Sequence, residues 1–587
     1  MKKTLFSLAL LLAATTAGAE NRSLEEMQSI AAAKLRQTAA VKSLTGKTVP
    51  QAALQRVMDN AAYSVFTSQQ STGFVIVAKS TLAAPIIGYS SEPFDTDNLP
   101  AGLRWYLGQV SRNLQDLEAG RRKAPRRAAT FTPVENFITT KWSQEYPFDR
   151  KTPNNYPCGC VATALAQCMN YCQWPASAEF VGTYFVTTSN GKKTTTDRKE
   201  VTVSTTYNWP YKDTYKAFGK YGDNIDELMR DCGYATYMEY EKNGSGTHGF
   251  MSGIALTHKF SYPSESVKQQ YFSYFDGDQE DWNQIIYDEL GRRCPILYGA
   301  NDESFGGHAF VFSGVDEEGL VYINWGWRGT ADGYYDIWAM NPQQDNMQLN
   351  FSGSHHMVYG IRKEALPTDH VESRISAYDS APYTFRWTTE KDDDGVEHHT
   401  LFCDQPYGLI NISSTDFEGV FGLFGQDLTD GTSWVIAEDL QDRDTIPAGY
   451  AYGGSSEQYK DFAYYYYIDG EHGLKPGHTY HLSFGTKNDL EGTWHSIIAD
   501  GGEVGYEVYY SGDPATSTIK EDNLGAPVMT AIHAPAAATA TDGLTRVYDT
   551  AGRLVYSAPA QQFNLWDVPA RGILVIKQGG QSRKVVR

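Results

Sequence analysis

Away from its first residues, the sequence contains no apolar run of about 18 residues, the length that a membrane-spanning helix needs. We therefore expect a soluble protein. Basic residues are outnumbered, with 50 Lys and Arg against 70 Asp and Glu and a formal net charge of −20. Because binding nucleic acid requires a positive surface, this charge disfavours nucleic acid as a partner.

Cysteine is scarce and its count is odd, at seven. In an exported protein an odd count leaves at least one thiol outside any disulfide within the chain. Four of the seven lie between Cys158 and Cys172, which raises the possibility of zinc, but the spacing C-x-C-x7-C-x3-C is not typical of a zinc site. We expect no metal and no other cofactor.

Residues 1–19 have the three parts of a secretory signal peptide. Lys2 and Lys3 are followed by an apolar run over 5–14, and small residues end the segment at Ala19. This pattern predicts cleavage after Ala19 and a protein that is secreted or displayed at the cell surface.

The next segment, residues 20–127, has the pattern of a separate α+β unit. We predict helices over 23–40, 41–62 and 103–117 and a buried strand over 73–79. The unit carries 14 Lys and Arg against 9 Asp and Glu, whereas residues 128–587 carry 34 against 61. This opposite charge favours docking of the unit onto the acidic remainder, and salt should weaken that docking.

A basic linker, Arg121-Arg-Lys-Ala-Pro-Arg-Arg127, ends the unit. It has no apolar periodicity and contains a proline, so it predicts an exposed and easily cleaved segment. We expect that one cut there would separate the two parts cheaply.

Residues 128–365 form the largest continuous unit, with helix patterns first and strand patterns second. We predict helices over 160–171, 224–232 and 281–290, and strands over 309–313 and 321–324 joined by a turn at 316–319. Helices followed by strands indicate an α+β layer fold.

Beyond residue 365 the helical periods end. Short strands separated by Gly, Asp and Pro turns predict a β-sandwich module over 366–520. A low-complexity linker over 521–541 leads to a small β unit over 542–587.

The strongest local signal for chemistry surrounds Cys160, which begins a helix whose apolar spacing is that of a buried helix. The free N–H groups and the dipole at a helix start stabilise a thiolate. Gly159 would let a substrate backbone approach closely. A small buried core residue is the alternative for Cys160, and it is the interpretation that we adopt for Cys168 and Cys172.

A reactive thiolate needs a base, and the base needs an orienting group. His308 follows two glycines and opens an apolar strand, and the paired strand ends in Asn324 and Trp325. Asn324 would accept a hydrogen bond from the imidazole while Trp325 covers it from water, and a structural histidine is the alternative. The order Cys, His, Asn is that of papain-like peptidases.

Four motifs in this order resemble the streptopain and interpain peptidases. They are Trp142 to Asp149, Gly159 to Gln167 with Met169, Trp174 and Pro175, Gly306 to Phe310, and Asn324 to Trp327 with Asp332 to Tyr334. The resemblance extends over residues 20–362, because the segment around 73–100 also resembles that family's inhibitory prodomain.

The resemblance implies a papain-like catalytic domain of an endopeptidase with broad specificity, a preference for an apolar side chain one residue before the scissile one, and maturation by removal of the prodomain. It implies Cys160 as nucleophile and His308 as base. Gln144 is a candidate oxyanion donor, or alternatively a turn-capping amide. Either Asn324 or Trp325 would fix the imidazole. Cys158 departs from the family pattern, in which a small or polar residue is expected.

The small unit over 542–587 resembles a sorting domain of the type IX secretion system, through Tyr548-Asp-x-x-Gly-Arg-Leu-Val555 and Gly572-Ile-Leu-Val-Ile-Lys577. A plain terminal β domain is the alternative. The resemblances together imply protein substrates, the chain's own prodomain and the secretion machinery as partners.

Two other function classes fit parts of the pattern. One is a catalytically idle surface protein that binds host proteins or carbohydrate. The other is acyl transfer by a transglutaminase-like enzyme, which would want Asp where Asn324 stands.

Overall fold

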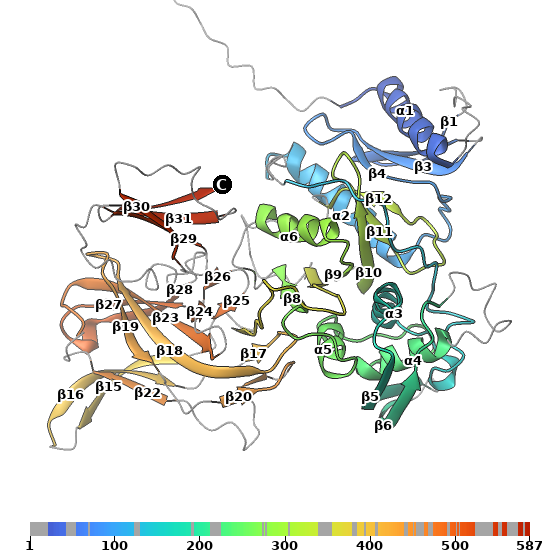
Figure 1. Cartoon of the computed structure of the whole chain (residues 1–587). Helices are drawn as coiled ribbons and strands as arrows, with labels where there is room; N and C mark the ends of the chain where they lie inside the picture. Colours follow the sequence, from blue (N-terminus) through green and yellow to red (C-terminus); the bar gives the residue numbers. More distant parts are fainter. Residues whose placement is uncertain are drawn as a thin grey trace, which may run out of the picture. The chain divides into compact units, whose positions relative to one another are not determined.

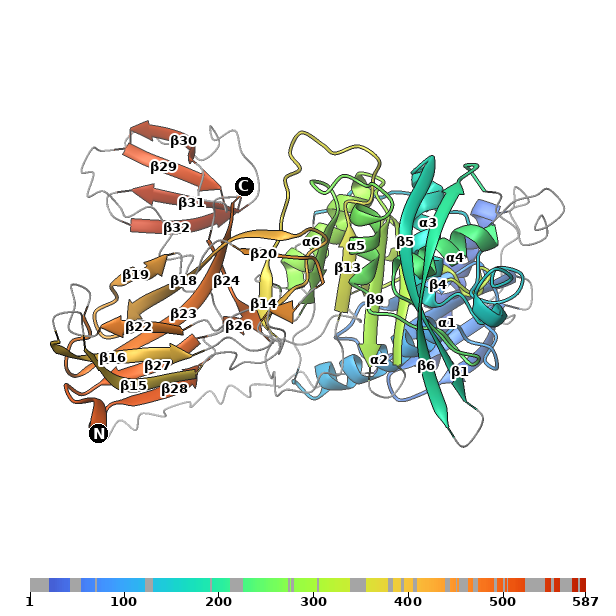
Figure 2. The ribbon, with the colours of Figure 1, turned by 90° about the horizontal axis from the view of Figure 1, so that it is seen from below.

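The computed structural model (Figures 1 and 2) describes most of the chain between residues 21 and 586. The described residues are 21–42, 54–68, 71–121, 130–189, 193–211, 225–272, 275, 279–302, 306–337, 355–377, 384–391, 395–404, 409–438, 444–449, 451–452, 463–467, 473–489, 494–499, 502–503, 505–522, 544–549, 554–559, 573–578 and 581–586. The chain divides into two compact units, one with residues 1–128, 315–325 and 329–341 and the other with 129–314, 326–328 and 342–587.

The first unit joins the N-terminal segment to a later stretch of the chain in one antiparallel sheet, with strand order β1-β2-β3-β4-β12-β11. Its elements are α1 (Leu24–Lys42), β1 (Leu54–Asp59), β2 (Tyr63–Ser68), β3 (Ser71–Ala78), β4 (Ile86–Ser90), α2 (Ala101–Glu118), β11 (Val321–Asn324) and β12 (Gly333–Tyr335).

Helix α1 covers one face of this sheet (Figure 1). Met27, Ala31 and Leu35 recur at i, i+4 and i+8, so they lie on one side of the helix. They are buried against a cluster of strand residues that includes Phe66 and Val75. Burial of an apolar side chain of this size contributes about 1.5–3 kcal/mol, so this face holds α1 to the sheet.

The helices expected over 23–40 and 103–117 and the strand expected over 73–79 are confirmed. The helix expected over 41–62 is wrong where it can be judged, because α1 ends at Lys42 and Leu54–Asp59 is strand β1. Antiparallel pairing with β2 outweighs the helical composition of these residues. An Asx turn at Asn60, whose side-chain oxygen accepts from the N–H groups of Ala62 and Tyr63, sets the hairpin. Residues 43–53 and the basic linker after Arg121 lie outside the described residues.

The second unit begins with the helices and strands that carry the candidate site. They are η2 (Pro153–Asn155), α3 (Cys160–Cys172), β5 (Ser177–Ser189), β6 (Thr194–Thr206), α4 (Ile225–Ala235), β7 (Glu239–Tyr240), α5 (Met251–His258), β8 (Lys268–Tyr271), α6 (Gln279–Gly291), β9 (Ile296–Asp302), β10 (Gly306–Val315) and β13 (His355–Tyr359). In this unit the strands run in the order β10-β9-β13-β8, and α3 packs against β9. The long strands β5 and β6 pair in a two-stranded ribbon (Figure 2). Strand β7 pairs with the other edge of β5. The three helices and both strands expected over residues 128–365 are confirmed. The second of these strands is β11, which belongs to the first unit.

From residue 375 the second unit consists almost entirely of strands. They are β14 (Ile375–Ala377), β15 (Thr384–Lys391), β16 (Glu397–Asp404), β17 (Leu409–Asn411), β18 (Phe417–Asp427), β19 (Ser433–Glu438), β20 (Asp444–Ile446), β21 (Ala451–Tyr452), β22 (Ala463–Tyr467), β23 (His478–Asn488), β24 (Trp494–Ser496), β25 (Ile498–Ala499), β26 (Gly502–Glu503), β27 (Gly505–Tyr510), the short helix η6 (Pro514–Thr516) and β28 (Thr518–Asp522). Sheets β14-β17-β21, β15-β16-β22 and β19-β18-β23-β27-β28 contribute side chains to one apolar cluster. We call residues 366–522 the β-module.

The chain ends in a sheet of order β30-β29-β31-β32, formed by β29 (Leu544–Asp549), β30 (Leu554–Pro559), β31 (Ile573–Gln578) and β32 (Gln581–Val586). The β character expected over 542–587 is confirmed. The linker expected over 521–541 lies largely outside the described residues. In the described part of the chain, no helix is long and apolar enough to cross a membrane.

Candidate active site

Cys160 is the first residue of α3, and Gly159 is the residue before the helix. Gly159 has φ +87°, a conformation that favours glycine. A Cβ at this position would lie 2.6 Å from the Met238 side chain and 3.1 Å from the Ser245 carbonyl oxygen. The glycine is therefore required by the protein's own packing, and its expected role in the approach of a substrate backbone stays a prediction.

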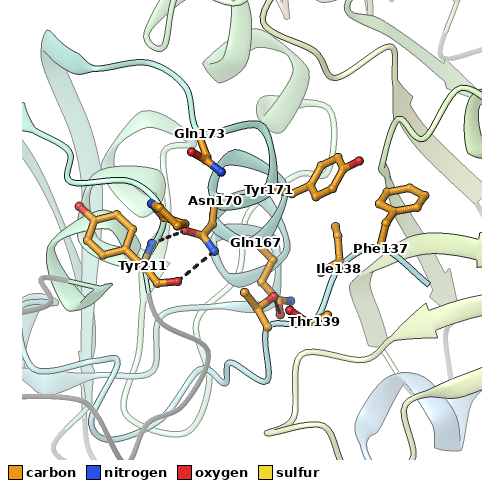
Figure 3. A pocket seen from close by; sticks show the side chains of 10 residues that line it. Phe137, Ile138, Thr139, Gln167, Asn170, Tyr171, Gln173 and Tyr211 are labelled. Atoms are coloured by element: carbon orange, nitrogen blue, oxygen red, sulfur yellow. Dashed lines mark hydrogen bonds between the residues drawn. The ribbon is translucent and has the colours of Figure 1, made fainter. Parts of the chain in front are cut away.

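The far end of α3 is held by polar side chains (Figure 3). The Thr140 hydroxyl donates to the Gln167 side-chain oxygen at 2.7 Å, and the Tyr211 N–H donates to the Asn170 side-chain oxygen at 2.7 Å. These residues line a cavity of about 540 Å³ that does not include Cys160. The cavity lies beside the last turns of α3. It is therefore a gap in the packing around this helix and is not part of the candidate site.

His308 lies on β10, where it pairs with Ala300 of β9, and it is 7% exposed. Because α3 packs on β9, this register brings the imidazole to the start of α3. His308 forms a hydrogen bond with the thiol group of Cys160. The structure thus joins two residues that are 148 positions apart in the sequence.

The electrostatics of Cys160 favour the thiolate. Burial alone would raise the pKa of its thiol. The hydrogen bond and the charge of His308, together with the N–H groups of Ala309 and Val161, outweigh burial and lower the pKa below the usual value for cysteine. The donors from α3 and β10 therefore favour the thiolate form of Cys160 more than its buried position alone would.

The other described thiols behave in the opposite way. Cys158 is fully buried, and burial followed by the negative charges of Asp149 and Asp226 raises its pKa well above the usual value. Burial likewise raises the pKa of Cys168, Cys232 and Cys294, and raises that of Cys172 to about 12. The six cysteines whose side chains are described all carry free thiols. Among them, Cys160 alone has a lowered pKa.

Gln144 is close to the start of α3 through its main chain. Its carbonyl oxygen accepts a hydrogen bond of 2.8 Å from the N–H of Cys158. The preceding residue Ser143 forms an isolated bridge with Trp327, and Trp142 accepts from the N–H of Arg328 at 3.0 Å. These bonds fix the segment that carries the Gln144 side chain.

Comparison with known proteins identifies two family segments in the chain. Residues 142–335 match the peptidase C10 family, and residues 21–114 match the Spi protease inhibitor family. The first match contains Gln144, Cys160, His308, Asn324 and Trp325. This part of the chain belongs to the peptidase C10 family.

Several relatives of this C10 peptidase are known. The thiol protease/hemagglutinin PrtT of Porphyromonas gingivalis is 28% identical over 308 residues, which are 48% of this chain and 35% of PrtT. Streptopain of Streptococcus pyogenes is 29% identical over 322 residues, 49% of this chain and 78% of streptopain. A prointerpain A fragment of Prevotella intermedia is 25% identical, with a TM-score of 0.43 over 53% of this chain and 99% of the fragment. The chain thus spans about a third of PrtT.

The family matches confirm the papain-like α+β domain behind an inhibitory prodomain, with β-rich sheets after it. Among the function classes that the sequence left open, these matches favour a cysteine peptidase.

Asn324 ends strand β11 of the first unit and Trp325 follows it, and both are buried. The Trp325 N–H donates to the Asp332 carboxylate at 2.9 Å, and its indole N–H donates to the Ala331 carbonyl at 3.2 Å. The Trp325 ring packs edge-on against Tyr335, with centroids 5.3 Å apart. These contacts hold Trp325 in one orientation.

Asp332 is a residue whose role sequence reasoning missed. It is 3% exposed, and its carboxylate sets the main chain at Trp325. The signal was present, because Asp332 begins the last part of the motif that follows Asn324 to Trp327. A carboxylate seven residues after Trp325 could have been interpreted as the group that fixes the main chain at Trp325.

One group of side chains in the β-module has the composition of a metal site, namely Asp427, Asp430 and His478. Their atoms already have protein partners. His478 Nδ1 lies 2.7 Å from Asp427, and Lys475 Nζ lies 2.7 Å from Asp430. The ammonium group of Lys475 thus supplies the positive charge that the carboxylates need.

Proposed function

We propose that the protein is an exported cysteine endopeptidase that hydrolyses protein substrates, with Cys160 as nucleophile and His308 as base. The observation that supports this best is the hydrogen bond between these two residues with the lowered pKa of Cys160. A thiolate beside an imidazolium is the resting state that nucleophilic attack on a peptide carbonyl requires.

In the proposed reaction the Cys160 sulfur attacks the carbonyl carbon, and the carbonyl π electrons move to oxygen. The resulting oxyanion would be stabilised by N–H groups at the start of α3 and by the Gln144 side-chain amide. His308 then gives its proton to the departing amine as the C–N bond breaks, which leaves a thioester. Neutral His308 next takes a proton from water, the water oxygen displaces sulfur, and a carboxylic acid leaves.

Asn324 and Trp325 are proposed positioning residues for His308. Asn324 would accept a hydrogen bond from the second ring nitrogen of the imidazole, and Trp325 would shield this bond from water. The anchoring of Trp325 by Asp332 supports the shielding role, because a covering side chain must be held in place.

Residues 20–127 are proposed as the inhibitory prodomain, and their contacts with later residues of the first unit support this. Strand β4 pairs with β12, where Tyr89 is opposite Tyr334. The Tyr106 hydroxyl donates to the Asp336 carbonyl at 3.2 Å, and its ring lies 6.2 Å from that of Trp325. The prodomain therefore contacts Trp325, the proposed shield of His308.

These contacts oppose release of the prodomain after a single cut. We expected that one cut in the linker would make separation cheap. Ser90 also donates its hydroxyl to the Asp332 carbonyl, and Lys34 lies 2.8 Å from Glu318. Because a cut in the linker leaves this sheet and its ion pairs intact, release needs a second event, such as further cleavage inside the prodomain.

We further propose export through the signal peptide at residues 1–19, with residues 542–587 as a sorting domain for a type IX secretion system. Residues 542–587 lie outside the segment that matches the C10 family, which supports a role outside catalysis. The signal peptide itself lies outside the described residues.

The test of the proposed reaction is hydrolysis of a general protein substrate by the processed protein and by its Cys160→Ala variant. We expect the variant to have no measurable activity and to remain unprocessed. Full residual activity in this variant would show that another group is the nucleophile.

A further inference from the structure

The β-module makes a close, directional contact with the peptidase part of the second unit. The Thr257 hydroxyl on α5 donates to the Ser414 carbonyl at 2.5 Å, and the Ser414 hydroxyl donates to the Val267 carbonyl at 2.6 Å. Gln269 donates to the carbonyl of Ile412, and Ser414 is 2% exposed. These hydrogen bonds fix the module relative to α5 and to the segment at the start of β8.

A cavity of about 890 Å³ lies along this contact. One wall comes from the β-module and consists of Asp416 with the loop 447–449. The opposite walls come from the turn over 237–248 and from helix α5. The loop is set by the Asp416 carboxylate, which accepts from the Ala448 N–H at 2.9 Å.

The cavity is connected to the candidate active site through the turn over 237–248. Met238 and Ser245 of this turn are the groups that contact Gly159, the residue before Cys160. Their neighbours Tyr237, Gly244 and Gly246 line the cavity. The turn over 237–248 therefore contacts the residue before Cys160 and also lines the cavity.

The lining suits an extended peptide segment with a positive charge. Met251 and Ile254 supply an apolar surface, and the lining holds three carboxylates, those of Glu239, Glu241 and Asp416. The basic side chains of the lining are Lys259, His248 and His258, and the His258 imidazole lies 3.8 Å from the Asp416 carboxylate. Carboxylates beside an apolar surface bind the head and the stem of a Lys or Arg side chain.

We propose that the β-module is part of the substrate-binding machinery, in which its wall of this cavity receives a Lys or Arg of the protein substrate outside the residues next to the scissile bond. This inference rests on the proposed peptidase function of Cys160. It makes the module a determinant of which proteins are cleaved, in addition to the residues beside Cys160.

The experiment compares kcat/KM for a short peptide with that for longer peptides of the same cleavage sequence, extended by a segment containing either Lys or Glu. The wild-type protein should prefer the Lys-bearing extension. Asp416→Asn removes the charge and keeps an oxygen for the Ala448 N–H. We expect it to lower kcat/KM for the Lys-bearing peptide about threefold, as is typical of an exposed charge, and to leave the short peptide unchanged.

A charge reversal on the opposite wall gives a readout that a structural role would not produce. Glu241 is exposed, and Glu241→Lys should invert the preference so that the Glu-bearing extension is cleaved faster. The matched control is Glu507→Gln on β27, which removes one charge from the β-module away from the cavity. It should leave both kcat/KM values unchanged.

The outcomes separate this inference from the function on which it rests. If the wild-type protein cleaves neither peptide, the proposed peptidase function fails. If it cleaves both and the two cavity variants alter all peptides equally, or none, the cavity does not select substrates and the inference is wrong.

Discussion

Lys34 of α1 lies 3.6 Å from Asp316 in the turn before β11, and both side chains are nearly buried, at 8% and 11% exposure. The Lys34 ammonium also lies 4.1 Å from the centre of the Tyr89 ring, and the Tyr89 hydroxyl donates to Asp316 at 2.9 Å. The proposed prodomain is thus tied to the peptidase sequence by a charged contact that water and salt reach poorly.

We predict that Lys34→Met weakens inhibition by the prodomain supplied in trans. The change leaves the Asp316 carboxylate without its cation, a loss of about 2 kcal/mol, so the inhibition constant should rise roughly thirtyfold. The control is Arg56→Gln, which removes an exposed prodomain charge that pairs with Asp59. Equal inhibition constants for both variants would show that the Lys34 contact does not contribute to docking of the prodomain.

Inhibition in trans should also weaken with salt, because the prodomain and the remainder carry opposite net charge. The Debye length falls from about 30 Å at 0.01 M to about 3 Å at 1 M, which slows the encounter of the two parts. The measurement is the inhibition constant across this range. A prodomain that inhibits at no ionic strength, or a precursor that is already fully active, would contradict the zymogen proposal.

The pH dependence of Cys160 alkylation should report its partner. In the processed protein, the rate of reaction with iodoacetamide should reach half its maximum below the usual pKa of a thiol. In His308→Ala the lowering contributions of the imidazole are lost while burial remains, so the midpoint should move to higher pH. Peptide mapping should find the label at Cys160 before any other cysteine. A midpoint that does not move would exclude His308 as the stabilising group.

Gly159→Ala should destabilise the fold by about 1–3 kcal/mol through its positive φ, with a further cost from the contact with Met238. The matched control is Gly431→Ala, because Gly431 has φ +79° and open space around its Cβ position. The difference between the two free energies of unfolding reports the contacts with Met238 and with the Ser245 carbonyl, and Met238→Ala should recover the part that Met238 contributes. Equal losses would show that the contact costs nothing.

Deletion of residues 542–587 should leave peptidase activity intact and stop the protein before the outer membrane. The measurement is activity in cell fractions from a host with a type IX system, with the full chain as control. Normal export of the shortened chain would refute the sorting role.

Much of the site was predictable because its signals are local. The start of α3 at Cys160, and the strands that begin near His308 and end at Asn324, follow from apolar spacing and glycine positions, and their order along the chain indicated the chemistry. The motifs also led to the correct family.

What could not be predicted depends on contacts between distant segments. Strand β1 forms because it pairs with β2 of the prodomain sheet, which the helical composition of 41–62 does not reveal. The reason for Gly159 is a methionine 79 residues away. The high pKa of Cys158 against the low pKa of Cys160, two residues on, likewise arises from burial, carboxylates and an imidazole that other segments supply.

Helix α5 and strand β8 contact the β-module in part through main-chain carbonyl oxygens of the module. The carbonyl oxygens of His370, Ile412 and Ser414 accept from the side chains of Lys268, Gln269 and Thr257. A main-chain acceptor is the same atom whatever side chain the residue carries. These three bonds therefore tolerate changes of side chain at His370, Ile412 and Ser414 without a compensating change in the peptidase. The bond from the Ser414 hydroxyl to the Val267 carbonyl does not, so Ser414 is the residue of this joint whose identity should persist when the module diverges.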